Sequence, residues 1–331
     1  MRNLFFLFTG VVLILTACSN PTTSYVANNG TVYGTYYNIK YESPNGKDLK
    51  EEIDKELERY TQIFSHYERN STISKINRNE ETELEPEFVT CFKKAMEVSY
   101  QTNGAFDITA GPLINAWGFG PEDRVTMTQE KVDSLKAICG YKKIRLIEGK
   151  IVKDIPEMQL NMSAIAKGYT CDLVGKFLAE KGCINYMIDI GGEVVAKGEN
   201  EKGKTWSIGI RKPLEDPFSS DLEAVIALPD HALATSGNYL NFYVEDGKKY
   251  AHTIDPSSGY PVQHSILSST VLSNDCMTAD AYATAFMVLG KEAGIEVINR
   301  VCDVEVFFIY ADKEGKDQVY ISDGFKDYIR K

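Results

Sequence analysis

The second half of the chain, residues 186–321, consists largely of short runs rich in β-branched and aromatic residues, separated by turn signals. Such runs predict strands, and glycine-containing dipeptides between them predict tight hairpins. The hairpin signals are Gly191-Gly192, Asp246-Gly247 and Glu314-Gly315. One strongly apolar segment, residues 278–289, interrupts the strands and predicts a helix that is buried. This half of the chain therefore predicts antiparallel sheet with a helix packed against it.

The first half adds more helix than strand. Residues 31–41 alternate in polarity and predict one strand. Residues 48–64 predict a helix with one apolar face, begun by the capping-box pair Asp48 and Glu51. Two further helices and a hairpin are expected over residues 86–104, 163–182 and 143–153, with Ser163 as a possible cap. Without an internal repeat, the whole pattern predicts an α+β fold of antiparallel sheets flanked by helices.

The N-terminus has the features of an export signal. Arg2 precedes an almost wholly apolar run over residues 4–15, which is shorter than the roughly 20 residues that span a bilayer. The run ends in Leu15-Thr16-Ala17-Cys18, which resembles the lipobox of bacterial lipoproteins. The resemblance implies a signal peptide over residues 1–17 and a lipid, such as palmitate, on Cys18. An ordinary signal peptide with a chance cysteine is the alternative.

The residues after Cys18 complete this picture of the chain. Residues 18–30 are polar and predict a flexible tether, which leaves residues 31–331 as the folded domain. We expect a protein anchored by its lipid on the extracytoplasmic, periplasmic side of the inner membrane, with the outer membrane as the alternative. The length allows one large domain or two closely packed lobes.

Charge and cysteine content exclude some partners and sites. The net charge of −11, without a basic run, argues against a nucleic-acid partner. None of the cysteines forms a C-x-x-C pair, and most lie in apolar contexts, so we expect buried free thiols, although an oxidising compartment permits disulfides. The cysteines after Cys18 are Cys91, Cys139, Cys171, Cys183, Cys276 and Cys302.

Several common catalytic motifs are absent from the sequence. It contains no G-x-G-x-x-G after a strand, no P-loop, no H-E-x-x-H and no G-x-S-x-G elbow; Ser236 lies in Ala-Thr-Ser-Gly-Asn instead. With 4 histidines and scattered cysteines, a closed zinc site is not expected. A site of carboxylate and other oxygen ligands for Mg²⁺ remains open.

Three segments of the first half could contact a ligand. Gly34, in residues 33–36, allows close approach by a ligand or marks a bend in the strand. Residues 64–67 could stack on a ring or form a helix end packed on the core. The glycine-rich loop over residues 104–120 brings backbone N–H groups, aromatic faces and Asp107 together. It predicts a cradle for a flat polar ligand or, equally, a structural Ω-loop.

Later segments carry charged groups. Residues 163–169 begin a helix with small side chains, where a phosphate could bind beside Lys167, although a surface lysine is the simpler alternative. His252 and Asp255 lie three residues apart at a strand end. Asp280 and Thr284 share one face of an otherwise apolar helix. A buried carboxylate needs a partner or a metal, so this pair predicts a Mg²⁺ grip or an acid favoured by the helix dipole.

Taken in order, six segments between about residue 32 and residue 290 resemble the ApbE family of FAD:protein FMN transferases. Any one of these segments is a weak signal, whereas six in the same order are specific. The segments are residues 104–113, 163–169, 189–193, 235–239, 252–259 and 280–285.

The resemblance implies a two-lobed architecture with FAD bound in the cleft between the lobes. It implies that Mg²⁺ is held by the backbone oxygen of Ala164 together with Asp280 and Thr284. It also implies that Ala105, Phe106 and Asp107 line the flavin and adenine region of FAD. The other residues that the resemblance implies in FAD binding are Tyr67, Lys167 and His252.

The reaction implied by the resemblance transfers FMN from FAD to a threonine hydroxyl of an acceptor flavoprotein, with release of AMP. Typical acceptors are subunits of membrane redox pumps. His252 has a suitable intrinsic pKa for the catalytic base, and Asp255 could orient it or bind metal.

Two other functions remain as alternatives. Lys167 replaces an acid found in some family members, and this change could favour a Mg²⁺-dependent FAD pyrophosphatase that releases FMN and AMP. The other alternative is a periplasmic flavin-binding lipoprotein without turnover.

Overall fold

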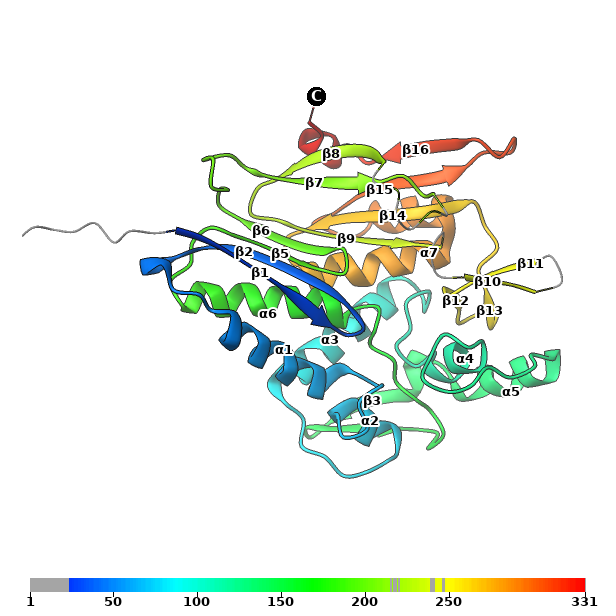
Figure 1. Cartoon of the computed structure of the whole chain (residues 1–331). Helices are drawn as coiled ribbons and strands as arrows, with labels where there is room; N and C mark the ends of the chain where they lie inside the picture. Colours follow the sequence, from blue (N-terminus) through cyan, green and yellow to red (C-terminus); the bar gives the residue numbers. More distant parts are fainter. Residues whose placement is uncertain are drawn as a thin grey trace, which may run out of the picture.

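The computed structural model describes residues 24–330, apart from residues 215, 217, 218, 220, 239–241, 246 and 247. Its centre is an eight-stranded sheet in the order β1-β2-β5-β6-β9-β14-β15-β16, and all neighbouring strands are antiparallel (Figure 1). The strands are β1 (Ser24–Val32), β2 (Thr35–Ser43), β5 (Tyr186–Ile190), β6 (Glu193–Lys197), β9 (Ala232–Gly237), β14 (Ile266–Ser273), β15 (Val304–Ala311) and β16 (Asp317–Ile321).

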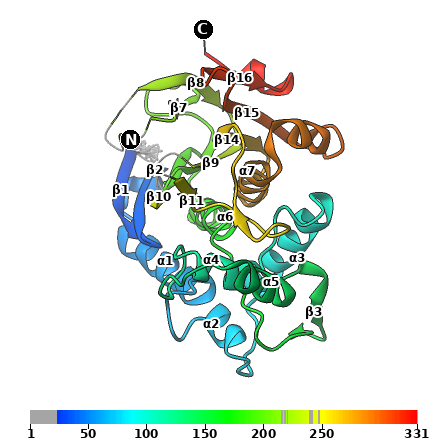
Figure 2. The same ribbon diagram turned by 90° about the vertical axis from the view of Figure 1, so that its right-hand side faces the viewer.

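Helices cover one face of this sheet. Helices α6 and α7 lie directly against the strands, and α1 and α3 pack beside them (Figures 1 and 2). Alternate residues of β5, such as Ile188, point into the large apolar core beneath these helices. The helices are α1 (Lys50–Phe64), α3 (Pro86–Gln101), α6 (Ala166–Glu180) and α7 (Cys276–Ile298). This arrangement confirms the predicted α+β fold of antiparallel sheet flanked by helices.

The other face of the sheet is covered by a two-stranded ribbon and a short 3₁₀ helix. The ribbon pairs β7 (Trp206–Arg211) with β8 (Leu222–Leu228), and the 3₁₀ helix is η3 (Gly324–Tyr328). A second apolar core lies between this cover and the sheet, with Phe325 fully buried in it. The middle strands β6, β9, β14 and β15 therefore contribute apolar residues to a core on each face of the sheet.

A smaller part of the molecule lies beside the helix-covered face (Figure 1). It contains α2 (Thr72–Asn77), α4 (Gly111–Ala116), α5 (Gln129–Ile138), η2 (Tyr141–Lys143), and the hairpins β3 (Ile144–Ile147) with β4 (Lys150–Lys153), β10 (Phe242–Glu245) with β11 (Lys248–Ala251), and β12 (Ile254–Asp255) with β13 (Tyr260–Pro261). The expected hairpin over residues 143–153 is therefore confirmed.

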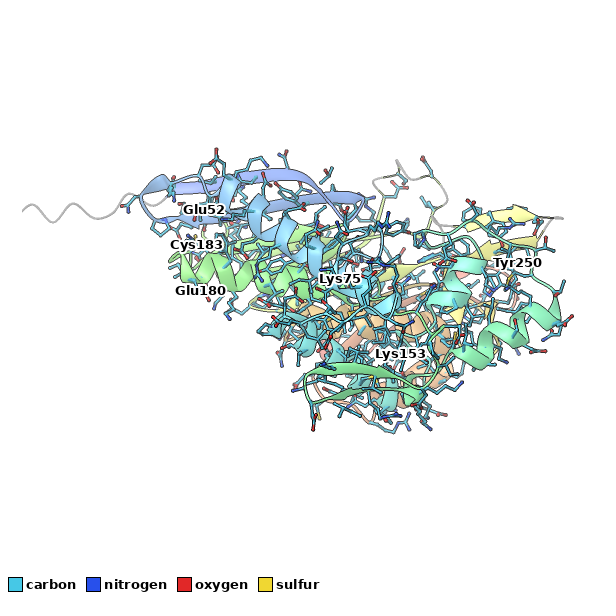
Figure 3. All side chains as sticks on the ribbon, turned by 90° about the horizontal axis from the view of Figure 1, so that it is seen from below. Glu52, Lys75, Lys153, Glu180, Cys183 and Tyr250 are labelled. Carbon is cyan, nitrogen blue, oxygen red and sulfur yellow. The ribbon has the colours of Figure 1, made fainter. Side chains whose placement is uncertain are left out.

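Specific contacts hold this smaller part together. The indole of Trp117 donates a hydrogen bond to the carbonyl of Gly259 at 2.9 Å, and Tyr250 stacks on it with a centroid distance of 5.5 Å. Lys153 donates to the carbonyls of Ile76 and Met158 at 3.0 and 2.9 Å and so joins the β3–β4 hairpin to α2. Figure 3 shows Tyr250 and Lys153 in this part of the molecule, seen from below.

The N-terminal strand corrects two expectations. The strand predicted over residues 31–41 is a hairpin of β1 and β2, because Tyr33 and Gly34 turn the chain with φ angles of 52° and 73°. Strand β1 begins at Ser24, so residues 24–30 belong to the sheet and not to a tether. Asn28 is buried, donates to Asp48 and accepts from Tyr41. A polar edge strand of this kind resembles a linker in composition.

Two helix boundaries also differ from the expectations. Helix α6 begins at Ala166 after Ile165, so the side chain of Ser163 does not cap it. Helix α7 extends to Ile298, past Gly290, whose φ of 79° interrupts the helical geometry. A connection by the 3₁₀ helix η1 (Pro44–Gly46) leads from β2 towards α1.

The cysteine side chains agree with the expected free thiols. All six cysteines after Cys18 are free thiols, and all except Cys302 are buried. Among the residues that the structure describes, no helix has the length and apolar character needed to cross a membrane. The expected signal peptide and Cys18 lie outside the described residues.

Candidate functional site

A cavity of about 400 Å³ lies between the helix-covered sheet and the smaller part of the molecule. Its wall combines the loop after α3, the start of α6, the β5–β6 turn, the end of β9, the segment around His252 and one face of α7. Of the residues expected at a site, the cavity wall contains Ala105, Phe106, Asp107, Ala164, Lys167, His252, Asp280 and Thr284. The structure therefore brings together groups that lie far apart in the sequence.

The loop over residues 105–107 owes its shape to the side chain of Asp107. One carboxylate oxygen accepts from the backbone N–H and the hydroxyl of Thr109 at 2.8 and 2.6 Å, and the other accepts from the N–H of Tyr141 at 2.8 Å. Burial raises the pKa of Asp107, whereas these hydrogen bonds favour its charged form. Asp107 thus fixes the loop that presents Phe106 and backbone groups to the cavity.

Helices α6 and α7 are in unusually close contact where their functional residues lie. The N–H of Gly168 donates to Asp280 at 2.9 Å, and a Cβ atom at Gly168 would lie 2.2 Å from the carbonyl oxygen of Cys276. Only glycine allows this approach. Asp172 of α6 also accepts from the N–H groups of Cys276 and Met277 at 2.8 Å each. These contacts fix Lys167 and Asp280 relative to each other.

A buried cluster of three charges forms the floor of the cavity. The ammonium of Lys167 lies 2.6 Å from one carboxylate oxygen of Glu193 and 3.9 Å from Asp280, and the side chains of both acids are almost fully buried. Burial raises the pKa of Glu193 and of Asp280, partly offset by the ammonium. Burial opposes the charge of Lys167, but the two carboxylates outweigh this effect and raise its pKa.

Glu193 is the functional candidate that sequence reasoning missed. It ends the segment over residues 189–193, directly after the hairpin signal Gly191-Gly192, and this local pattern does not show that its side chain is buried. In the structure it begins β6 and points into the cavity. Its second carboxylate oxygen is buried and has no hydrogen-bond partner within the described part of the chain. This oxygen is available to a donor or a cation of a ligand that binds in the cavity.

The residues expected to hold Mg²⁺ do share the cavity wall. Thr284 lies one helical turn after Asp280, and its hydroxyl is 3.2 Å from that of Ser236. Among the described residues, no group of three or more His, Cys, Asp or Glu side chains could hold a metal. A cation here would therefore bind one carboxylate, neutral oxygens and the substrate. This all-oxygen set fits Mg²⁺, which binds through one or two carboxylates plus substrate phosphates.

His252 and Asp255 differ in their placement. His252 lies in the cavity wall, with its ring 6.3 Å from that of Phe119. Asp255 is not part of the wall. Its carboxylate accepts from the N–H and hydroxyl of Ser257 at 2.8 and 3.0 Å, and from the N–H of Ser258 at 3.3 Å. Asp255 therefore helps to fix the turn between β12 and β13, and its expected catalytic or metal-binding role stays a prediction.

Tyr67 lies outside the cavity. It follows the end of α1, is 63% exposed, and packs its ring against His66 at a centroid distance of 4.4 Å. Its predicted contact with a dinucleotide would have to involve a part of the ligand that extends beyond the cavity, and it stays a prediction.

Comparison with known proteins agrees with this geometry. The ApbE family model matches residues 33–308. The chain is 39% identical to the FAD:protein FMN transferase of Vibrio cholerae serotype O1 over 97% of both chains, and 36% identical to that of Haemophilus influenzae over 88% of both. The solved structure of the flavin transferase ApbE from Vibrio cholerae superimposes with a TM-score of 0.84, covering 93% of this chain and all of that one. The chain belongs to the ApbE family.

Proposed function

We propose that this protein is an FAD:protein FMN transferase. The observation that carries the proposal is the meeting of Asp280, Thr284 and Lys167 with His252 in one cavity. The names of the relatives support it, because these relatives match nearly the whole chain at up to 39% identity. The volume of the cavity falls within the range of pockets that bind cofactors.

In this proposal FAD binds with its pyrophosphate next to Asp280, Thr284 and Ala164. The loop over residues 105–107 and Phe119 offer aromatic and backbone groups to the ring systems. Bound Mg²⁺ would neutralise charge on the pyrophosphate and polarise the phosphorus. The floor holds two buried acids beside one ammonium, and burial raises the pKa of both acids, so a cation at Asp280 would favour their charged forms.

The transfer needs a nucleophile from a second protein. The oxygen of an acceptor threonine forms a bond to the phosphorus on the FMN side of the pyrophosphate. The bond between this phosphorus and the bridging oxygen breaks, and AMP leaves with that oxygen. His252, in the cavity wall, accepts the proton of the hydroxyl, which is a poor nucleophile without a base.

Hydrolysis of FAD is the second candidate, favoured by Lys167. This ammonium is held in the floor of the cavity by Glu193 and remains charged, so it can stabilise a phosphate when water is the nucleophile. The same site and the same metal would serve both reactions, and only the acceptor of FMN differs.

One experiment separates these functions from flavin binding without turnover. The protein is incubated with FAD, Mg²⁺ and the flavin-free form of a redox-pump subunit that accepts FMN on a threonine, and AMP, free FMN and covalent flavin on the subunit are measured. Covalent flavin with an equal amount of AMP supports the transferase. Free FMN with AMP supports the pyrophosphatase, and unchanged FAD would overturn both.

We further propose that the protein is anchored by a lipid on Cys18 and faces the extracytoplasmic side of the inner membrane. The apolar run over residues 4–15 and the small residues before Cys18 support this proposal. An anchor would raise the effective concentration of membrane-bound acceptors. Mass spectrometry of the N-terminal peptide should find an acylated Cys18, and the Cys18→Ser variant should be released from membranes.

A further inference from the structure

The central sheet is split where it borders the cavity. Strand β9 pairs with β14 along its whole length, but it pairs with β6 only at Val194–Leu233 and Val195–Ala232. Among the described residues, no strand pairs with the β6-facing edge of residues 234–237. Backbone groups along such an edge can accept a further strand.

A second cavity, of about 580 Å³, lies on the opposite face of the sheet beneath the β7–β8 ribbon. Its wall shares Gly191, Thr235 and Gly237 with the first cavity. These residues belong to the β5–β6 turn and to the unpaired part of β9, so the two cavities meet at the split. We call the second cavity the ribbon groove, and the gap between Gly191–Gly192 and residues 234–237 the notch.

The ribbon groove has a surface suited to an extended peptide. Glycines at 191, 192, 209 and 237 expose backbone along its wall, and a Cβ atom at Gly192 would meet nothing within 4 Å. The carboxylate of Asp189 accepts from the N–H of Gly192 at 2.9 Å and thereby holds the turn. Tyr36, which is 44% exposed, and the exposed Arg211 supply an aromatic face and a positive charge.

We propose that the ribbon groove binds an extended segment of the acceptor protein, and that the notch admits the hydroxyl of this segment to the catalytic cavity. The inference rests on the proposed transferase function. FAD fills the first cavity, so a protein nucleophile needs its own approach to the phosphorus. The groove is continuous with the catalytic cavity, and the unpaired edge of β9 offers main-chain hydrogen bonds of the kind that bind peptides by strand addition.

The test measures FMN transfer at varied concentrations of the acceptor subunit, together with the affinity for FAD. Ser207→Trp fills the ribbon groove, and Arg211→Glu reverses its charge; neither residue lines the catalytic cavity. Lys212→Glu is the matched control, because it makes the same change of charge at an exposed neighbour outside the groove. If Ser207→Trp disturbs folding, Arg211→Glu still tests the proposal, because Arg211 is exposed and its substitution should leave the fold intact.

We expect both groove variants to raise the KM for the acceptor by about tenfold, because each removes a contact with the acceptor. The kcat and the affinity for FAD should stay unchanged. The control should behave as wild type. An unchanged KM in both groove variants would overturn the docking proposal, and so would a matching loss of FAD affinity, which would place FAD in the groove. Absence of covalent transfer by the wild-type protein would instead overturn the proposed function.

Discussion

The two walls of the catalytic cavity are built in different ways. The floor is formed by α6, α7 and β6, where Lys167, Glu193 and Asp280 are buried beside one another. The opposite wall comes from a loop and from the chain between short hairpins, where Asp107 fixes the loop through backbone N–H groups. Asp255, outside the wall, fixes the neighbouring turn in the same way. Charge is thus concentrated in the floor, whereas the carboxylates on the opposite side shape the chain.

This difference separates two kinds of residue. Lys167, Glu193 and Asp280 belong to the core, because α6 and α7 are joined through Gly168 and Asp172. Substitutions there should affect folding and chemistry together. His252 lies in the cavity wall on a segment next to short strands, so its substitution should affect chemistry alone. Variants of the floor and of His252 should therefore differ in stability as well as in activity.

The largest effect is expected for Asp280→Ala. It removes the carboxylate that lies one helical turn before Thr284 in the cavity and leaves the N–H of Gly168 without its acceptor. We expect FMN transfer to fall by about 10³-fold or more, because charge stabilisation at the pyrophosphate is lost. AMP release measured across a range of Mg²⁺ concentrations checks this, with circular dichroism as the folding control. Activity that is regained at high Mg²⁺ would indicate a weakened metal site.

His252→Ala should lower the rate of FMN transfer by about 10²-fold, as expected for loss of a general base. The free energy of unfolding and the affinity for FAD should stay unchanged, in contrast to Asp280→Ala. Single-turnover transfer and urea denaturation measure the two quantities. Intact transfer under saturating FAD and Mg²⁺ would show that His252 is not the base.

Lys167→Met should lower the free energy of unfolding by about 3 kcal/mol, because it leaves two buried carboxylates without a cation. The double variant Lys167→Met/Glu193→Gln removes one of these charges and should regain part of the loss. Urea denaturation of both variants and of Glu193→Gln completes the double-mutant cycle. Additive losses would mean that the two side chains do not interact, and the description of the floor would then be wrong.

The smallest effect concerns His66, outside the catalytic cavity. Burial lowers its pKa to about 4, and its Nε2 has no hydrogen-bond partner among the described residues. The unfolded chain therefore binds a proton below about pH 6.5 that the folded protein does not, so stability falls as the pH drops from about 6.5 to about 4. We expect a loss of about 2 kcal/mol between pH 7.5 and pH 5. His66→Gln should reduce this pH dependence while transfer by the folded protein persists.

The sequence predicted the floor only in part, and the reason is physical. Asp280 stood out because an acid inside an apolar helix needs a partner. Glu193 did not, because its burial depends on the β5–β6 hairpin folding under α6, which is a tertiary contact. The surroundings of Asp255 could not be predicted either, since a spacing of three residues from His252 cannot show that its carboxylate accepts hydrogen bonds from the N–H groups that follow it.

The fold class followed from local patterns, but the architecture of the sheet did not. Alternating runs and glycine turns indicate antiparallel strands, and the hairpins around Glu148-Gly149 and Glu314-Gly315 form as predicted. The pairing of β6 with β9 joins strands from distant parts of the chain and ends after two residue pairs. Its early end depends on long-range register, which no local pattern contains.

The notch also bears on how the product leaves. After transfer the flavin is part of the acceptor, so the acceptor must carry a large ring system out of the enzyme. The Gly191–Gly192 turn and Gly237 both lie at strand ends, so the described strands do not enclose the notch on all sides. A modified segment can then move sideways out of the enzyme with its flavin attached, whereas a closed passage would trap the flavin behind the strands.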